Sequence, residues 1–591
     1  LDASGTTAGG SVHVGGAWQG GGDTYRATTT TVEAGATLAA NATSLGAGGE
    51  VVVWSDGHTA FAGHVEARGG AAGGDGGRLE VSGKQTLAFA GTADASAPTG
   101  AAGSLLLDPT DLTIGEAEAG VLARVLRTGT STSLQADRDI TVNAPIVGGD
   151  RVAGGGLSLT AGQHIAVNDF IVTNNGAISL TAQTGTVTVA PGKAVFSGTA
   201  PLTVVTQGTI STGALVSGGP LSVRSVAGSV RVDSVLDGRS GPIDLRAGED
   251  VEISQAIVNL ASGPQALTVA AGRDVTVAAP VDGRGGVEGG AITMTAGNRL
   301  TVAQPIVSNN AGVTLTASGG ALTVAEGTPI VTGTGALALS ARGDVTTGPA
   351  SASTFAVMSA AGAVHVNGLI DAATGDARLS AATDVNINQA IVNGQTGRSL
   401  AVTAGRDVNV NAIVDGRGGV SGGAVTMTAG RNLNVNDWIA TGNGAVGLTA
   451  TGGAATVASG RGIVSGNGAI TMRAAGDVTT GAVSGGSFEA ASTGGAVRLN
   501  GLVDGSTGRV NLSAASDVVV NAAVLNGRSG AAFNATAGRD VIVNAAIDGR
   551  GGATGGAVAL RAGRDVAINS TIATNNGAIG ATATSGALDM A

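Results

Sequence analysis

The feature that most constrains this chain is an internal duplication. The pentapeptide AGRDV occurs at 271–275, 404–408 and 537–541, and the segment DGRGG recurs at the same interval. A diverged copy begins at 137–140, so about three and a half of these cassettes fill residues 116–591. Self-similarity at a fixed period, here about 133 residues, is the signature of a repeat architecture in which each unit packs on its neighbours.

A shorter period inside the cassette identifies the repeating unit. Six units of about 22 residues fill each cassette, and each consists of short runs such as VNVNAIV, separated by Gly, Asn or Asp. Alternation of apolar and polar residues is typical of strands, and no segment shows a convincing helical period. Units this short leave no room for crossover helices, so the chain should wind into a solenoid.

We therefore predict an all-β fold, a right-handed parallel β-helix with about 22 residues per coil and roughly 27 coils. Residues 1–115 should form a less regular segment of this β-helix, and residues 116–591 the repeat region with six coils per cassette. The two parts should make one continuous rod.

Asparagines recur at one position of the coil, four residues after an Asp or its substitute. Stacked at a corner, such side chains can pair their amides along the axis, and Asn tolerates a left-handed backbone. We expect a structural ladder formed by Asn143, Asn168, Asn388, Asn411, Asn436, Asn521, Asn544 and Asn569.

Asp-Gly pairs mark a second corner of the coil. Glycine adopts positive φ without a steric penalty, so we expect structural turns with left-handed glycines here. The pairs that recur with the cassette are Asp282 and Gly283, Asp415 and Gly416, and Asp548 and Gly549.

Composition excludes several functional classes. The formal net charge is −11, which is the wrong sign for a nucleic-acid partner. Cysteine is absent, so neither disulfides nor thiolate metal sites contribute, and no cofactor is expected. No run of residues approaches the roughly 18 to 20 apolar positions that cross a bilayer. The sequence begins without a leader and ends in an unfinished repeat, so we expect the native polypeptide to continue.

The first hundred residues carry a resemblance to a known family. GGSVHVGGAWQGGG at 9–22, GGEVVVWSDGHTAFAGHVEARGGAAGGDGGRLEVSGKQTLAFAG at 48–91 and GAAGSLLLDPTDLTI at 100–114 follow one another in order. Together they resemble large bacterial exoproteins of the filamentous haemagglutinin type, which are exported by two-partner secretion. The repeats after residue 115 share only their general repeat pattern with that family.

This resemblance implies a right-handed β-helix, a location outside a Gram-negative cell, and a role in adhesion, aggregation or biofilm. It also implies an outer-membrane transporter as a partner, together with a carbohydrate or protein receptor, or further copies of the chain. The Asn-Pro motifs of the family's secretion domain do not occur in this sequence.

Parallel β-helices can also be carbohydrate-active enzymes, which is an alternative to the attachment function. Such enzymes need clustered carboxylates and usually aromatic platforms, whereas this chain has one Tyr, three Trp and seven Phe. Its Asp and Arg residues recur in every cassette, which favours architecture, because an active site is normally built once. We expect no enzymatic activity.

Three further features of the sequence could have a functional role. His58 and His64 are close in sequence, but the five histidines are too dispersed to predict a metal site. The isolated tryptophans Trp18, Trp54 and Trp438 more often cover a core than contact a ligand. Arg342, Gly343 and Asp344 form an RGD tripeptide, a possible adhesion motif, although the next cassette has Ala-Gly-Asp at the equivalent place.

Three functional classes remain: an adhesive rod, a subunit of a self-assembling filament or sheath, and a carbohydrate-active enzyme. We expect the first, a secreted surface adhesin or biofilm-matrix protein.

Overall fold

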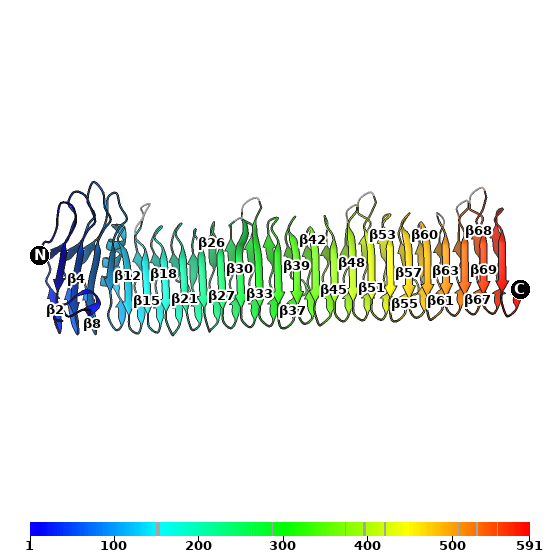
Figure 1. Ribbon diagram of the computed structural model, residues 1–591, viewed down its shortest axis with the longest axis horizontal. Coiled ribbons are helices and arrows are strands. Elements are labelled where there is room, and N and C mark those ends of the chain that lie inside the picture. Colours follow the sequence, from blue (N-terminus) through cyan, green and yellow to red (C-terminus); the bar gives the residue numbers. More distant parts are fainter. Residues whose placement is uncertain are drawn as a thin grey trace. The chain divides into compact units, whose positions relative to one another are not determined.

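The structure is a computed structural model of the 591-residue chain. It describes all residues except 149–153, 262, 286–287, 373, 394–396, 419–420, 506–507, 527–529 and 552–553, and only the backbone of 263–265. The chain forms two compact units, residues 1–297 and 298–591. Each unit is a parallel β-solenoid in which successive strands lie side by side, so the predicted fold class is confirmed (Figure 1).

In the first unit, each regular coil contributes one strand to each of three sheets. One such coil consists of β15 (Leu157–Ala161), β16 (Ile165–Val167) and β17 (Ile171–Val172). The next coil pairs with it in parallel through β18 (Ile178–Ala182), β19 (Val187–Val189) and β20 (Ala194–Phe196). Leu157, Leu159 and Ala161 are buried while Ser158 and Thr160 are half-buried, as the alternation of strand side chains requires.

The N-terminal coils of this unit differ from the later ones. Their principal strands are β1 (Ser11–Val14), β4 (Glu50–Ser55), β7 (Arg78–Gly83) and β10 (Ser104–Leu107), which pair in parallel. Two additional three-stranded sheets accompany them. These sheets contain β2 (Thr29–Val32), β5 (His58–Phe61) and β8 (Thr86–Phe89), and β3 (Thr37–Ala39), β6 (His64–Glu66) and β9 (Thr92–Asp94).

In the second unit, the cassette repeats in register. Starting from Val313 in β36 (Val313–Ala317), the pairing partners in successive coils are Leu337, Phe355, Ala377, Leu400, Val425 and Val446. Val446 in β54 (Val446–Ala450) therefore lies six coils and one complete cassette further along the chain than Val313. Six coils fill one cassette here.

Coil length varies although the strands keep their register. The coil that leads from Leu337 to its partner Phe355 is short, whereas the coil that leads from Leu400 to Val425 is longer. The first coils are longer still, because Ser11 pairs with Glu50. The described residues consequently form fewer coils than the predicted 27.

The core is narrow and is built mainly from Val, Leu, Ile and Ala. The buried side chains repeat in columns, for example Val385, Val408 and Leu433 at paired positions of β46 (Val385–Ile387), β49 (Val408–Val410) and β52 (Leu433–Val435). Five phenylalanines are fully buried, and Phe61 stacks on Phe89 with ring centroids 5.5 Å apart. Small branched side chains suit this space because each coil adds only about 4.8 Å of height.

The prediction that no helix would form was wrong. Helix α1 (Glu116–Arg127) lies where the predicted N-terminal segment meets the repeat region, and it buries Val121, Leu122, Val125 and Leu126. Glu118 accepts a hydrogen bond from the backbone N–H of Gly115 at 3.1 Å, which caps the first turn. The apolar spacing over 119–126 fits a helix, but the surrounding strand periodicity concealed it.

The expected backbone conformations at the two corners were also wrong. Gly283, Gly416 and Gly549 have no positive φ and instead end strands β32 (Val281–Gly283), β50 (Val414–Gly416) and β68 (Ile547–Gly549). The left-handed glycines lie six residues later, at Gly289, Gly422 and Gly555, with φ near 60°. The ladder asparagines likewise keep negative φ, because each continues the strand hydrogen bonding to the previous coil.

No helix in the described part of the chain is both long and apolar enough to cross a membrane.

Candidate functional site

The AGRDV motif and its variants form an inter-coil contact at one corner of the coil, which in one example lies between β51 (Ala424–Ala429) and β52. In the coil containing β52, the Arg431 Nε atom donates to Asp407 of the preceding coil at 2.8 Å, and its Nη2 donates to the second carboxylate oxygen. The backbone N–H of Asn432 donates to the same carboxylate at 3.0 Å. One Asp therefore holds both the side chain and the backbone of the next coil.

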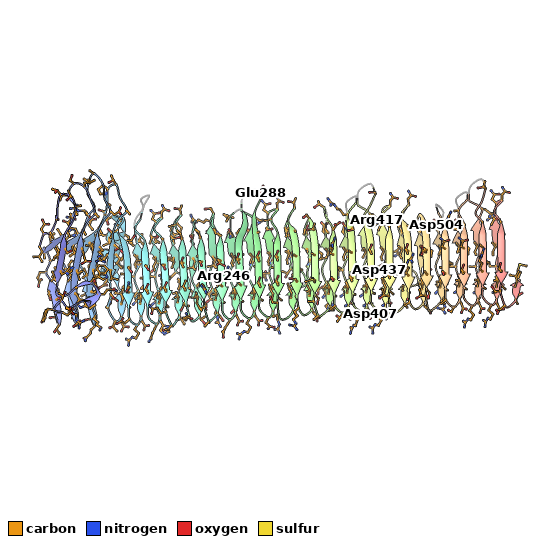
Figure 2. The ribbon with its side chains drawn as sticks, in the orientation of Figure 1. Arg246, Glu288, Asp407, Arg417, Asp437 and Asp504 are labelled. Carbon is orange, nitrogen blue, oxygen red and sulfur yellow. The ribbon has the colours of Figure 1, made fainter. Side chains whose placement is uncertain are left out.

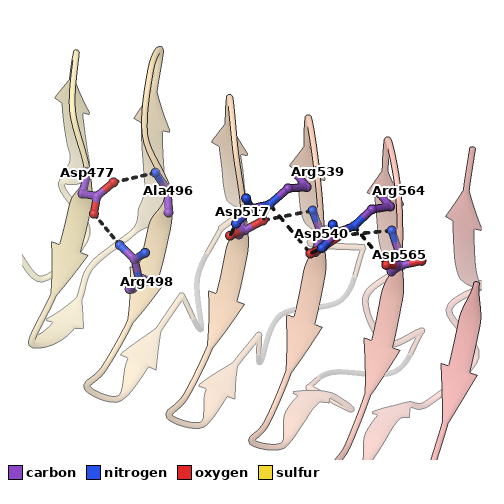
Figure 3. Close-up of polar contacts among 8 residues, drawn as sticks. All are labelled: Asp477, Ala496, Arg498, Asp517, Arg539, Asp540, Arg564 and Asp565. Atoms are coloured by element: carbon purple, nitrogen blue, oxygen red, sulfur yellow. Dashed lines mark hydrogen bonds and ion pairs between the residues drawn. The ribbon is translucent and has the colours of Figure 1, made fainter. Parts of the chain in front are cut away.

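The same three-point contact recurs in both units, and we call it the Arg–Asp ladder. Figure 3 shows two consecutive steps, from Asp517 to Arg539 and from Asp540 to Arg564. The Nε to Oδ1 distances range from 2.7 to 3.1 Å in six pairs: Arg138–Asp111, Arg273–Asp250, Arg406–Asp384, Arg431–Asp407, Arg539–Asp517 and Arg564–Asp540.

The electrostatics of the ladder follow from this geometry. Hydrogen bonding from Arg431 lowers the pKa of Asp407 below its ordinary value, and Arg539 does the same for Asp517. Opposite charges within hydrogen-bond distance favour the ionised carboxylate. The ladder is therefore charged at neutral pH and serves to join coils.

The eight predicted asparagines form amide ladders at a separate position of the coil. Asn143 is an acceptor, and the Nδ2 of each later member donates to the Oδ1 of the Asn in the preceding coil at 2.9 Å, as Asn411 does to Asn388. The other steps are Asn168 to Asn143, Asn388 to Asn367, Asn436 to Asn411, Asn521 to Asn500, Asn544 to Asn521 and Asn569 to Asn544.

Sequence reasoning missed several members of this system. Asn367 and Asn500 belong to the Asn ladder, but Ala363 and Ala496 stand where the preceding Asp was sought. A second amide column on the strand itself was also missed, in which Asn409 donates to Asn386 at 2.9 Å. The repeated VNVN and VNIN segments are the signal that could have revealed it.

The Asp-Gly corners form contacts within one coil. Arg417 donates to Asp415 through both its side chain and its backbone N–H, the latter at 3.0 Å, and the N–H of Gly423 closes the loop on the Gly416 carbonyl at 2.8 Å. Asp282 with Arg284 and Asp548 with Arg550 repeat the arrangement, and Arg550 lowers the pKa of Asp548 to about 2. In Figure 2, Arg417 lies at the opposite rim of the solenoid from Asp407.

The RGD tripeptide occupies an ordinary corner of the solenoid. It lies between β39 (Ala336–Ala341) and β40 (Val345–Thr347), and the backbone N–H groups of Arg342 and Gly343 bond to the preceding coil. The Asp344 carboxylate accepts a hydrogen bond from Ala363 of the next coil at 2.8 Å. Asp477, one cassette later, receives the same bond from Ala496 (Figure 3).

The histidines are not brought together. His58 bonds to Thr86 and His64 to Thr92, each one coil away on a separate small sheet. In the described part of the chain, no group of three or more His, Asp or Glu side chains has an arrangement suited to a metal ion.

A buried carboxylate in the first unit was not anticipated. Glu80 lies on the outward side of β7, yet it is fully buried because the short helix η1 (Trp18–Gly20) covers it. The backbone N–H of Gln19, which has a φ of 53°, donates to Glu80 Oε2 at 2.8 Å. Burial raises the pKa of Glu80 to about 7. The alternation of β7 places Glu80 opposite the core residues Leu79 and Val81, and the long-range contact with η1 buries it there.

The glycine pairs that carry the family resemblance have a direct packing reason. Gly9, Gly10, Gly48, Gly49, Gly76 and Gly77 stack across successive coils and line an open groove of about 590 Å³ with Glu50 and Arg78. A Cβ at Gly49 would lie 1.9 Å from the Gly10 carbonyl oxygen, and one at Gly77 2.0 Å from that of Gly49. Only glycine permits this approach of neighbouring coils.

Comparison with known proteins identifies no family, since no family model matches the chain and no curated protein matches it.

Proposed function

We propose that this chain is the stiff scaffold of a secreted surface adhesin or biofilm-matrix protein of a Gram-negative bacterium. The observation that carries the proposal is the coupling of successive coils by side chains in addition to the backbone. The Arg–Asp ladder and the Asn ladder occupy separate positions of the coil, and both recur from cassette to cassette.

A scaffold joined in this way suits a protein that displays a contact surface at a distance from the cell. Backbone pairing alone gives a solenoid, and charge-assisted bonds between coils add resistance to bending and shear. The Arg–Asp ladder recurs in every cassette. A mechanical role requires such recurrence, because each coil must be joined to the next. Export by an outer-membrane transporter and attachment to a carbohydrate or protein receptor complete the proposal.

The test combines imaging with an attachment assay. We expect negative-stain electron microscopy to show separate thin rods on cells and after purification, and deletion of the gene to reduce attachment to surfaces or to other cells. Ordered fibres of purified protein would instead make it a filament or sheath subunit. Unchanged attachment in the deletion strain, without fibres, would contradict both functions.

A further inference from the structure

A partly exposed aromatic side chain interrupts the otherwise small side chains beside the Asn ladder of the second unit. Trp438 precedes β53 (Ile439–Thr441), two residues after ladder residue Asn436, and is half-buried. Its six-membered ring lies against Gly462 of the next coil, where a Cβ atom would come within 2.8 Å of Trp438 Cζ3. Because Gly462 has no side chain, the indole of Trp438 can occupy this position on the surface.

Two charged side chains belong to the residues next to Trp438 and Gly462 in sequence. Asp437 Oδ1 accepts the backbone N–H of Trp438 at 3.0 Å and lies 3.4 Å from Nη1 of Arg461. The Arg461 side chain remains 48% exposed, so it is accessible to a ligand. Trp438, Asp437 and Arg461, which we call the Trp438 site, thus bring together an aromatic side chain, a carboxylate and a guanidinium (Asp437 is labelled in Figure 2).

The cassettes provide an internal comparison. At the positions equivalent to Asp437, Trp438 and Arg461, the preceding cassette has Gln304, Pro305 and Thr328. The acid, the aromatic ring and the base are therefore absent together from a coil with the same backbone pairing. Neither the core nor the ladders require these three side chains. The three residues are therefore not part of the architecture of the repeat.

A related set in the first unit places its cation over the aromatic ring. Asp169, Phe170 and Lys193 occupy comparable positions, but Lys193 donates to Asp169 at 2.9 Å and its Nζ lies 4.8 Å above the Phe170 ring. The cation lies over one face of the ring there, while the Phe170 residue as a whole remains 39% exposed. This set offers a matched control, since the residue types are similar and one face of its ring is occupied by the Lys193 ammonium group.

We propose that the Trp438 site binds a sugar ring of a neutral, linear polysaccharide. A pyranose presents an apolar face of C–H groups and an edge of hydroxyls, which suits an indole with a carboxylate and a guanidinium on neighbouring residues. A polyanionic polymer is disfavoured by the net charge of −11. The inference deepens the proposed attachment function and rests on it.

The test uses the full chain and a panel of immobilised neutral oligosaccharides, namely linear hexamers of glucose, mannose, galactose and N-acetylglucosamine in α and β linkages. We expect the wild type to bind at least one of them, and Trp438→Ala and Arg461→Ala to bind it about tenfold more weakly or worse. Phe170→Ala should bind like the wild type.

Three outcomes would overturn the inference: no binding of the panel by the wild type, unchanged binding by Trp438→Ala, or an equal loss in Phe170→Ala. Arg461→Ala distinguishes a loss of binding from a structural effect, because this substitution leaves the indole in place. The thermal unfolding of Arg461→Ala should match that of the wild type. If the gene deletion abolishes attachment while the wild type binds no panel sugar, this inference fails and the attachment function stands. If sugars bind but attachment is unaffected, the attachment function fails instead.

Discussion

Arg431 reaches from its own coil to Asp407 of the preceding one, and the backbone N–H of the adjacent Asn432 bonds to the same carboxylate. A single side chain thus anchors two groups of the next coil. Because Asp407 itself donates its backbone N–H to Asp384, the contact passes from coil to coil.

Removing one carboxylate from the ladder should loosen the next coil. Asp407→Ala leaves the Asn432 N–H without its acceptor, so we expect a loss of about 1 to 2 kcal/mol in the free energy of unfolding. Hydrogen exchange at the Asn432 amide should accelerate. Arg417→Ala breaks an ion pair within one coil and should change stability by less than about 0.5 kcal/mol. Equal effects of the two substitutions would contradict an inter-coil role.

The Asn ladder should tolerate shortening at its end better than interruption in its middle. Asn411 both donates to Asn388 and accepts from Asn436, whereas Asn569 only donates, to Asn544. We expect Asn411→Ala to cost about twice as much stability as Asn569→Ala, at about 1 kcal/mol per amide bond. Urea denaturation of both variants measures this ratio.

Replacing the same middle residue by a carboxylate provides an independent check. Asn411→Asp cannot donate to Asn388 when ionised, so it should be more destabilising at pH 7 than at pH 3. A pH-independent effect would argue against the amide ladder.

Glu80 should make the first unit less stable as the pH rises. The pKa of Glu80 is raised from 4.5 to about 7 in the folded protein, chiefly by burial. The folded state therefore holds a proton that the unfolded state releases, and the resulting stabilisation is complete below pH 4.5 and is lost as the pH passes 7. The change amounts to roughly 3 kcal/mol.

The variant Glu80→Gln keeps an acceptor for Gln19 without the charge, so its denaturation midpoint should vary much less between pH 5 and pH 8. Asp244→Asn, which alters an exposed pair with Arg246, should retain the pH dependence of the wild type. A pH profile of Glu80→Gln that follows the wild type would show that another group titrates.

The RGD tripeptide should behave as a structural corner. Asp344 caps the N–H of Ala363 as Asp477 caps that of Ala496, so Asp344→Ala and Asp477→Ala should accelerate hydrogen exchange of these amides alike. Neither substitution should alter attachment of integrin-bearing cells to the immobilised protein. A loss of attachment confined to Asp344→Ala would instead assign the tripeptide an adhesive role.

Much of this molecule could be predicted because its contacts repeat. The positions of Asn411 and Asn436 recur with the coil, so the periodicity that predicts the strands also aligns their amides. The Arg–Asp ladder was less accessible, because its partners Arg431 and Asp407 are 24 residues apart and only the coil register brings them together.

Features that occur once were beyond sequence reasoning. Glu80 is buried by η1, a turn about 60 residues earlier, and Asn367 joins the ladder without the Asp that marked the others. The left-handed backbone was placed at Gly416 instead of Gly422, because an Asp-Gly pair is a strong local turn signal that the strand pairing of β50 overrides.

The register between Val313 and Val446 bears on how such a chain changes length. Since one cassette brings the backbone back to an equivalent point after six whole coils, unequal recombination between two cassettes of the gene would add or delete complete coils. The new junction would present the same strand edges and the same ladder partners as the old one. A lineage could therefore alter the reach of this protein in a single genetic step without creating a misfolded joint.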